Sequence, residues 1–461
     1  MAISKTAQPQ FNPYGDDDPL PLNVGGGWLA PSAPGELRAT VQLPGSKSLT
    51  NRELVLAVLA NGPSLLRAPL HSRDTALMIE ALRTLGASIV EVAGAGQFGP
   101  DLLVTPGELG GGSIDCGLAG TVMRFIPPVA ALALGPVAFD GDVSARKRPM
   151  RTTIDSLRKL GVDVSDDGRG ALPFSLYGTG AVVGGEIEID ASASSQFVSG
   201  LLLAAPRFTN GLRLRHTGER LPSLPHIEMT IACLVARGVV VETPEPGLWI
   251  VPAAEIQALD VDIEPDLSNA APFLIAAVVA GGSVTIENWP DATTQVGADL
   301  EHLLPRFGAT VTRTAHSLTV TGGGPVMGVD LDLSAGGELA PALVALAALS
   351  AQPSRITGIG HLRGHETDRL AALVADINGL GGAVTELDDG LAIEPRALHG
   401  GPWGAYEDHR MATAGAIIGL VTPGVAVDDI GTTAKTLPQF PELWAAMLGG
   451  VPVGTNPVEL L

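Results

Sequence analysis

Long apolar runs recur along this chain, and small polar residues introduce each of them. Six of these runs show no polar face at helical spacing. A helix that is apolar on every side belongs in a protein interior. We therefore predict six buried helices, at residues 48–60, 120–134, 195–205, 268–280, 338–349 and 409–420.

A second, amphipathic helix follows each of these apolar runs. It ends at a glycine, and β-branched residues typical of a strand come next. A glycine just past the last turn is a common helix stop, because it adopts the left-handed backbone conformation without strain. The six terminating glycines are Gly86, Gly161, Gly238, Gly308, Gly381 and Gly449.

These two landmarks define a repeat of roughly 70 residues, built as strand, buried helix, strand, amphipathic helix and strand. Six repeats suggest two α/β domains of three repeats each. We place one domain at 46–262 and the other at 37–45 plus 263–461, with 1–36 as a flexible arm. The chain then crosses between domains twice, and ligands favour the cleft between two such domains.

The composition excludes several classes of partner. A formal net charge of -21 argues against nucleic acid and anionic membranes, so an anionic substrate would need a local basic pocket. Two cysteines, Cys116 and Cys233, cannot build a disulfide framework and favour a reducing compartment. Because we find neither a secretory signal nor an apolar run long enough to span a bilayer, we expect a cytoplasmic protein.

One segment, at 43–53, places Lys47, Arg52 and several hydroxyls at the start of an apolar helix. The chain has few lysines, and a helix N-terminus offers free N–H groups to an anion, so a phosphate fits this position. A capped helix with solvated charges fits the segment equally well. The segment alone leaves both interpretations open.

Other helix starts carry similar polar groups. Residues 146–151 hold four cations, and Ser194, Ser195 and Gln196 offer hydrogen bonds either to a ligand or to the helix backbone.

The His/Glu/Asp cluster at 361–368 matches no zinc spacing, so we predict no metal site. Two carboxylates, Glu338 and Glu366, are candidates for proton transfer. The candidate cations are Lys47, Arg52, Arg124, Arg148, Arg369, Arg410 and Lys435.

Seven short motifs, in order over residues 36–455, resemble those of the 5-enolpyruvylshikimate-3-phosphate synthase family. The resemblance implies a two-domain, inside-out α/β fold of six βαβαββ units with the active site in the interdomain cleft. The motifs are Pro-Gly-Ser-Lys-Ser…Asn-Arg (44–52), Ala-Gly-Thr…Met-Arg (119–124), Arg-Pro-Met (148–150), Ser-Ser-Gln-Phe (194–197), Glu-Thr-Asp-Arg (366–369), Asp-His-Arg-Met (408–411) and Thr-Ala-Lys-Thr (433–436).

The resemblance implies transfer of the enolpyruvyl group of phosphoenolpyruvate to the 5-hydroxyl of shikimate 3-phosphate, without a cofactor. We expect a monomer with these two small molecules as partners. Glu338 would act as base and Glu366 as proton donor near Lys47. The implied contacts to shikimate 3-phosphate are Lys47, Ser48, Arg52, Ser194, Ser195, Gln196, Ser223, Glu338 and His365. Those to phosphoenolpyruvate are Lys47, Gly120, Arg148, Gln196, Arg369, Arg410 and Lys435.

The chain departs from the family pattern at a few positions. Leu118 stands where many members have Asn, and Glu338 replaces the commoner Asp, which lengthens the reach of the base by one methylene. His361 and His365 replace Asn and Lys.

Two other functions compete with this interpretation. The UDP-N-acetylglucosamine enolpyruvyl transferases usually have Lys-Asn where this chain has Lys47-Ser48. They also carry a reactive cysteine near the position of Arg148, and no cysteine lies between Cys116 and Cys233 here. The second competitor is a non-catalytic protein that binds phosphorylated metabolites, which the two retained carboxylates disfavour.

Overall fold

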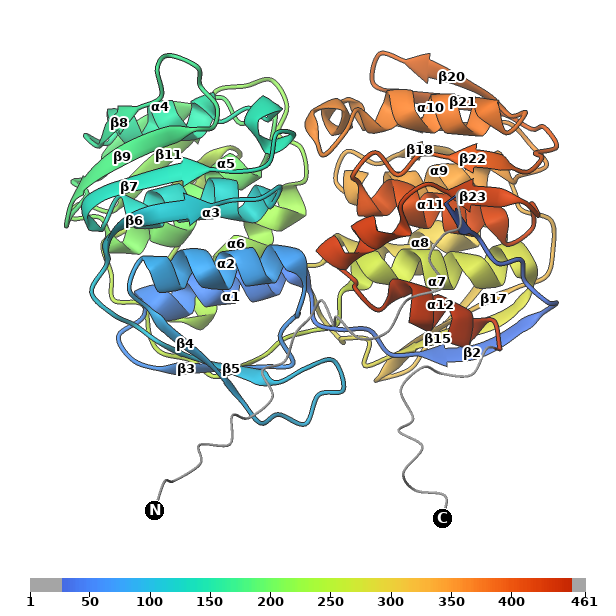
Figure 1. Ribbon diagram of the computed structural model, residues 1–461, viewed down its shortest axis with the longest axis horizontal. Helices are drawn as coiled ribbons and strands as arrows, with labels where there is room; N and C mark the ends of the chain where they lie inside the picture. The colour runs from blue at the N-terminus through green and yellow to red at the C-terminus, as the bar shows by residue number, and fades with distance from the viewer. Residues whose placement is uncertain (1–26, 450–461) are drawn as a thin grey trace, which may run out of the picture.

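The computed structural model describes residues 27–449 as two lobes joined side by side (Figure 1). Each lobe has its own hydrophobic core. One core draws on residues between Leu54 and Ile256, and the other on residues between Leu267 and Met447 together with four residues near the start of the described chain. No helix in this described range is long and apolar enough to cross a membrane.

The six apolar helices lie in the interior of the lobes, as the sequence predicted. Every residue of α3 and of α9 is buried, which agrees with the lack of a polar face in their sequences. The predicted bounds of α3 were too long, because the chain turns after Ala130 and Leu134 already belongs to a strand. The buried helices are α1 (Lys47–Leu59), α3 (Gly120–Ala130), α5 (Gln196–Ala204), α7 (Leu267–Ala280), α9 (Ala340–Ala348) and α11 (His409–Gly419).

The amphipathic helices also form where predicted, and each ends before its glycine. All six glycines adopt positive φ angles, between 81° and 113°, so each provides the left-handed stop that the pattern required. The helices are α2 (Arg73–Thr84), α4 (Arg151–Lys159), α6 (Leu224–Ala236), α8 (Leu300–Leu303) with the 3-10 turn Leu304–Phe307, α10 (Arg369–Gly379) and α12 (Phe440–Met447).

Small mixed sheets cover the outer faces of the helices in the first lobe (Figure 1). Each has four strands, with a parallel pair at one side and an antiparallel hairpin at the other. In order, the sheets are β14 (Val261–Asp262), β3 (Ser64–Arg67), β5 (Asp101–Thr105), β4 (Ser88–Val92); then β6 (Gly110–Asp115), β7 (Leu134–Asp140), β9 (Phe174–Thr179), β8 (Asp163–Ser165); then β10 (Gly185–Ile189), β11 (Leu212–His216), β13 (Leu248–Val251), β12 (Glu242–Glu245).

The second lobe has two sheets of the same kind and a third with three strands. In order, they are β16 (Thr310–Arg313), β17 (Ser317–Gly322), β15 (Gly282–Glu287), β2 (Leu37–Val41); then β18 (Asp330–Asp332), β19 (Ser354–Thr357), β21 (Gly390–Glu394), β20 (Ala383–Leu387); then β1 (Trp28–Leu29), β23 (Val425–Val427), β22 (Gly401–Trp403).

Two strands next to the connections between the lobes do not join the lobe that comes after them in the chain. β2 runs parallel to β15 in the second lobe, where Val41 lies opposite Ile286, and Figure 1 shows it beside β15 and β17. β14 instead extends the first sheet of the first lobe by pairing with β3. The two connections between the lobes touch where Gly45 pairs with Pro265.

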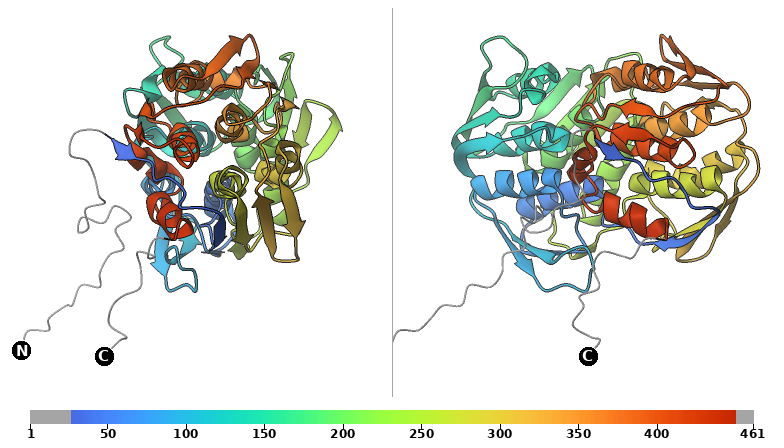
Figure 2. Two further views of the ribbon diagram at one scale, coloured as in Figure 1. Left: turned by 90° about the vertical axis from the view of Figure 1, so that its right-hand side faces the viewer. Right: turned by 45° about the vertical axis from the view of Figure 1, so that its right-hand side comes forward.

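The last part of the segment predicted as a flexible arm at 1–36 belongs to a sheet. Residues 1–26 lie outside the described range, but Trp28 and Leu29 form a strand that pairs antiparallel with β23, and Ala30 is buried. Figure 2 shows this short blue strand against the last repeat. Within the described residues, β22 and β23 are the strands of that repeat's sheet, and β1 completes it as a third strand.

Candidate functional site

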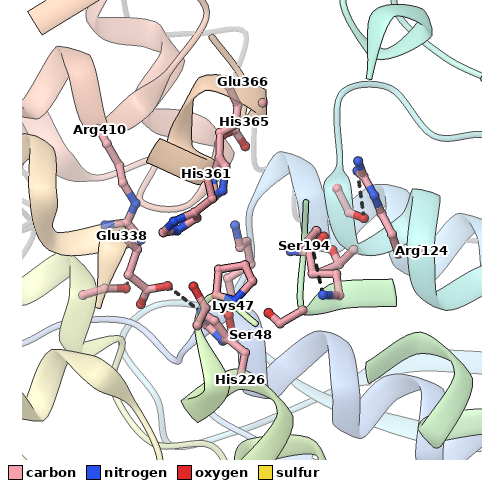
Figure 3. A pocket seen from close by; sticks show the side chains of 18 of the residues that line it. Lys47, Ser48, Arg124, Ser194, His226, Glu338, His361, His365, Glu366 and Arg410 are labelled. Carbon is pink, nitrogen blue, oxygen red and sulfur yellow. Dashed lines mark hydrogen bonds and ion pairs between the residues drawn. The ribbon is translucent and has the colours of Figure 1, made fainter. Parts of the chain in front are cut away.

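A pocket lies between the two lobes, where the buried helices begin (Figure 3). The starts of α1, α3 and α5 supply one wall, and the starts of α7 and α11 with the turn at Gly337–Leu339 supply the other. The side chains that matter below are, from the first lobe, Lys47, Ser48, Gly120, Arg124, Arg148, Ser194, Ser195, Gln196, Ser223 and His226, and, from the second, Glu338, His361, His365, Glu366, Arg369, His409 and Arg410.

All but two of the site residues expected from the sequence line this pocket. The first exception is Arg52, a buried residue of α1 that donates hydrogen bonds to the carbonyls of Ser48 and His226 and to the Thr230 hydroxyl, each at 2.8 Å. The second is Lys435, which lies behind Glu366 rather than at the pocket surface. Both residues therefore act on groups of the pocket wall.

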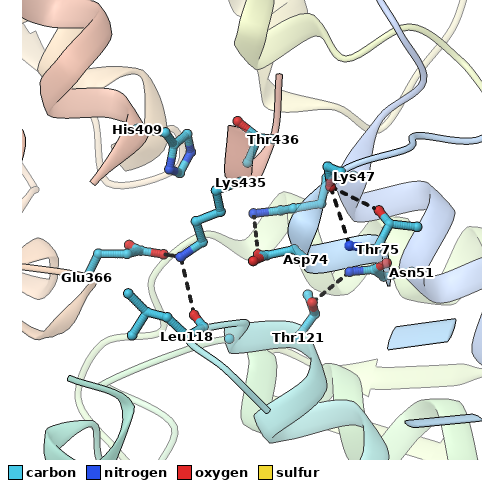
Figure 4. Close-up of polar contacts among 12 residues, drawn as sticks. Lys47, Asn51, Asp74, Thr75, Leu118, Thr121, Glu366, His409, Lys435 and Thr436 are labelled. Carbon is cyan, nitrogen blue, oxygen red and sulfur yellow. Dashed lines mark hydrogen bonds and ion pairs between the residues drawn. The ribbon is translucent and has the colours of Figure 1, made fainter. Parts of the chain in front are cut away.

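Lys47 begins α1 and stands at the junction of the lobes. Its backbone N–H donates to Asp266 of the second lobe at 3.1 Å, and its Nζ lies 3.8 Å from the Asp74 carboxylate (Figure 4). Burial lowers the pKa of Lys47, and the positive charges of Lys435 and Arg410 add to this, while Asp74 opposes it. The helix start is thus both capped and basic.

Glu366 lies among three cations that come from separate parts of the chain. Its carboxylate accepts from Lys435 Nζ at 2.6 Å and Arg369 Nη2 at 3.1 Å, and Arg148 lies 4.0 Å away. Burial alone would raise its pKa, but Lys435, Arg148 and Arg369 outweigh burial and hold the pKa well below its ordinary value. In this arrangement Glu366 is an ionised carboxylate.

The second candidate carboxylate, Glu338, contacts a histidine on the opposite side of the pocket. Its Oε2 lies 2.6 Å from Nε2 of His226, which belongs to the other lobe (Figure 3). Burial would raise the pKa of Glu338, but His226, Arg410 and Lys47 together hold it below the ordinary value. A carboxylate that stays ionised suits the role of a base.

An acidic residue outside the predicted set orients Arg369 and caps the helix that carries Arg410. Asp408 accepts from Arg369 Nε at 2.7 Å and from Arg369 Nη2 at 3.1 Å, and it caps α11 by accepting from the Arg410 N–H. Arg410 also donates to Ser268 at 3.2 Å. Such paired hydrogen bonds fix the direction of a guanidinium group.

Gly120 leaves the space in which three side chains meet. A Cβ at this position would lie 3.2 Å from Arg148 Nη2, 3.2 Å from Gln196 Oε1 and 3.3 Å from Arg124 Nη1. Arg124 is buried and has one guanidinium nitrogen without a hydrogen-bond partner. It was noted in the sequence as a cation but given no role.

The sequence reasoning missed several other residues of the pocket wall. His226 was not singled out, His409 appeared only as part of a motif, and His361 appeared only as a departure from the family pattern. The signal that could have found them is their position at the start of a helix or in the turn before one. All three line the same pocket.

The pocket is small in this arrangement, with a volume of about 90 Å³. Ligand pockets usually enclose about 300–1,000 Å³. The contacts of Glu366 with its cations and of Glu338 with His226 occupy the space between the lobes. Anionic ligands would therefore replace some of these contacts as they enter.

Solved structures of enolpyruvyl transferases share the fold of this chain. It is similar to EPSP synthase from Acinetobacter baumannii, with a TM-score of 0.73 at 23% identity, over 91% of this chain and 97% of that one. It is also similar to the enolpyruvyl transferase NikO from Streptomyces tendae, with a TM-score of 0.71 at 17% identity, over 90% and 96% of the two chains.

Sequence comparison identifies the family of this chain. The family model for EPSP synthase (3-phosphoshikimate 1-carboxyvinyltransferase) matches residues 31–444. A 3-phosphoshikimate 1-carboxyvinyltransferase from Kocuria rhizophila is 59% identical over 429 residues, which cover 92% of this chain and 96% of the relative. The chain belongs to the EPSP synthase family, and it is a transferase of the shikimate pathway. The resemblance inferred from the motifs is confirmed.

Proposed function

We propose that this chain transfers the enolpyruvyl group of phosphoenolpyruvate to the 5-hydroxyl of shikimate 3-phosphate and releases phosphate. One observation carries the proposal beyond the family match. In a protein with a net charge of -21, cations from both lobes converge on one pocket with the candidate carboxylates Glu338 and Glu366. Such a pocket suits two anionic substrates and proton transfer between them.

Shikimate 3-phosphate would occupy the side of the pocket formed by α1, α5 and the start of α6. Lys47 and the hydroxyls there would hold its phosphate and ring oxygens, and Arg52 would add positive charge from beneath while it fixes the Ser48 carbonyl. The residues assigned to this substrate are Lys47, Ser48, Arg52, Ser194, Ser195, Gln196, Ser223, Glu338 and His365.

Phosphoenolpyruvate would lie between the start of α3 and the starts of α10 and α11. Its carboxylate and phosphate would take the arginine and lysine contacts that Glu366 now holds. The residues assigned to it are Lys47, Gly120, Arg148, Gln196, Arg369, Arg410 and Lys435.

The reaction would proceed by addition and then elimination. Glu338 removes the proton of the 5-hydroxyl while the methylene carbon of phosphoenolpyruvate gains a proton from Glu366. The tetrahedral product of this addition then loses a methyl proton and its phosphate. Arg148, Arg369 and Lys435 stabilise the negative charges throughout.

Glu366 is ionised in this structure, and a proton donor must carry a proton. It can therefore act as donor only if substrate binding changes its surroundings. The phosphate and carboxylate of phosphoenolpyruvate compete for its three cations. Once those charges are shared, burial dominates and the pKa of Glu366 rises, so that it takes up a proton. We therefore propose that substrate binding itself protonates Glu366.

An assay of phosphate release with each acceptor tests the assignment. Phosphate release from phosphoenolpyruvate should require shikimate 3-phosphate, and UDP-N-acetylglucosamine should not replace it. Release with the nucleotide sugar, or binding of shikimate 3-phosphate without turnover, would favour one of the two competing functions.

We further propose that 46–262 and 37–45 plus 263–461 are the two domains, and that the protein works as a cytoplasmic monomer without a metal or other cofactor. The pairings of β2 with β15 and of β14 with β3 support these boundaries. Sedimentation velocity would test whether the protein is a monomer. Limited proteolysis at 42–46 and 259–264 would test the domain boundaries.

A further inference from the structure

His226 is fixed by its backbone, and its ring reaches across the pocket. It lies in the first turn of α6, just after Ser223, whose backbone is left-handed (φ 53°) and whose N–H donates to Ser334 of the other lobe. The His226 carbonyl accepts from Arg52 at 2.8 Å and from Thr230 at 3.0 Å. These contacts hold the backbone of His226 in place at the helix start.

The ring of His226 contacts the carboxylate of Glu338, which belongs to the other lobe. Nε2 lies 2.6 Å from Glu338 Oε2, and the two side chains are 18% and 19% exposed. The cations that interact with Glu338 are Lys47 and Arg52 on α1, Arg369 on α10 and Arg410 on α11, and the carboxylates Asp266 and Glu366 line the same pocket. In the described structure, the hydrogen-bond partner of the Glu338 carboxylate is the His226 ring.

We propose that His226 is a positioning residue for the base Glu338, and this inference rests on the proposed role of Glu338. The Nε2–H group donates to Oε2, so Oε1 remains free to accept the proton of the 5-hydroxyl. The extra methylene of Glu338, relative to the Asp that is commoner in the family, gives the carboxylate the reach for this contact across the cleft.

The hydrogen bond also has an electrostatic consequence. A donor binds a carboxylate more strongly than it binds the neutral acid, so it favours the ionised base. Loss of this donor should move the acid limb of the pH profile toward higher pH, because Glu338 would take up a proton more readily.

Two substitutions separate the hydrogen bond from the shape of the ring. His226→Phe keeps a flat side chain but removes the donor, whereas His226→Gln keeps an N–H donor. We expect His226→Phe to lower kcat by about 10–100-fold, the size expected for one hydrogen bond to a charged group. Its acid limb should rise by about one pH unit. His226→Gln should keep kcat within about fivefold and retain the acid limb of the wild type.

Two controls complete the experiment. His316→Phe changes an exposed histidine in the turn between β16 and β17 and should match the wild type. In a Glu338→Gln background, His226→Phe should have almost no further effect on kcat, because the base is already absent. Thermal unfolding of each variant verifies that it folds.

The outcomes distinguish the inference from the proposed function. Near-normal kcat in Glu338→Gln would refute the base itself. A slow Glu338→Gln variant with a normal His226→Phe variant would refute the role of His226 alone. Equal losses in His226→Phe and His226→Gln, with an unchanged pH profile, would show that the histidine only packs against the cleft and would also overturn the inference.

Discussion

Replacing Gly120 with alanine probes the tightest point of the proposed phosphoenolpyruvate site. The new Cβ would sit 3.2 Å from Arg148 Nη2 and from Gln196 Oε1. Ordinary contacts of a Cβ lie at about 3.4–4 Å, so both side chains must move by a few tenths of an ångström. Gly120 does not have a positive φ, so its backbone accommodates alanine.

The size of the effect follows from the groups that move. A hydrogen bond to a charged group contributes about 1.5–3 kcal/mol, and a small displacement forfeits part of that. A loss of about 1 kcal/mol corresponds to a rise of about fivefold in the KM for phosphoenolpyruvate. We propose that glyphosate, an anion with a phosphonate and a carboxylate, occupies the place of phosphoenolpyruvate. It should lose more affinity, because the methyl group fills the space beside it.

Steady-state kinetics with glyphosate as inhibitor provides the measurement. We expect competition with phosphoenolpyruvate in the wild type and an inhibition constant at least tenfold higher in Gly120→Ala. The matched control is Gly379→Ala in α10, where a Cβ meets no atom within 4 Å and both constants should stay unchanged. Uncompetitive inhibition, or an unchanged inhibition constant in Gly120→Ala, would refute this account of the pocket.

Further predictions concern single charges. Lys47→Met should lower kcat/KM by about 10²–10⁴-fold, since it removes a charge proposed to contact both substrates; activity within about threefold of wild type would contradict the assignment. Glu366→Gln should lower kcat far more than it weakens the binding of shikimate 3-phosphate measured by calorimetry. Binding of phosphoenolpyruvate to this variant should no longer take up a proton, which a comparison of binding heats in buffers of different ionisation enthalpy would measure. EDTA should leave activity unchanged, and recovery by an added divalent ion after a loss would contradict this. Burial raises the pKa of Asp376 to about 6, against the hydrogen bonds that it accepts from Tyr406 and Gly404, so ionisation costs stability as pH rises from about 4 to about 6. Asp376→Asn should therefore gain on the order of 2 kcal/mol of unfolding free energy relative to wild type between pH 4 and pH 7, and an equal difference at both pH values in urea unfolding would refute the titration.

The pattern of the sequence predicted the helices well because their burial and their stops are local properties. The apolar run of α9 and the glycine after α10 each report on their own segment. β1 could not be found this way, since two residues make a strand only when a distant partner, β23, lies beside them.

The chemistry of the site divides in a similar way. Family motifs identified Glu366 as a candidate acid, but its ionised state depends on Arg148 and Lys435, which only the tertiary structure brings near it. The contact between His226 and Glu338 joins two lobes and left no spacing signal in the chain.

The pairing of β2 with β15 has a consequence for the order in which the protein can form during translation. β2 leaves the ribosome before any of the first lobe, yet its partner emerges only after that lobe has been made. The first lobe can therefore assemble while β2 waits with its backbone groups unpaired, and such an edge invites association with other chains. A release of the chain after the first lobe would leave this strand permanently exposed, so premature termination should produce aggregates more readily than a fragment that starts at Ser46.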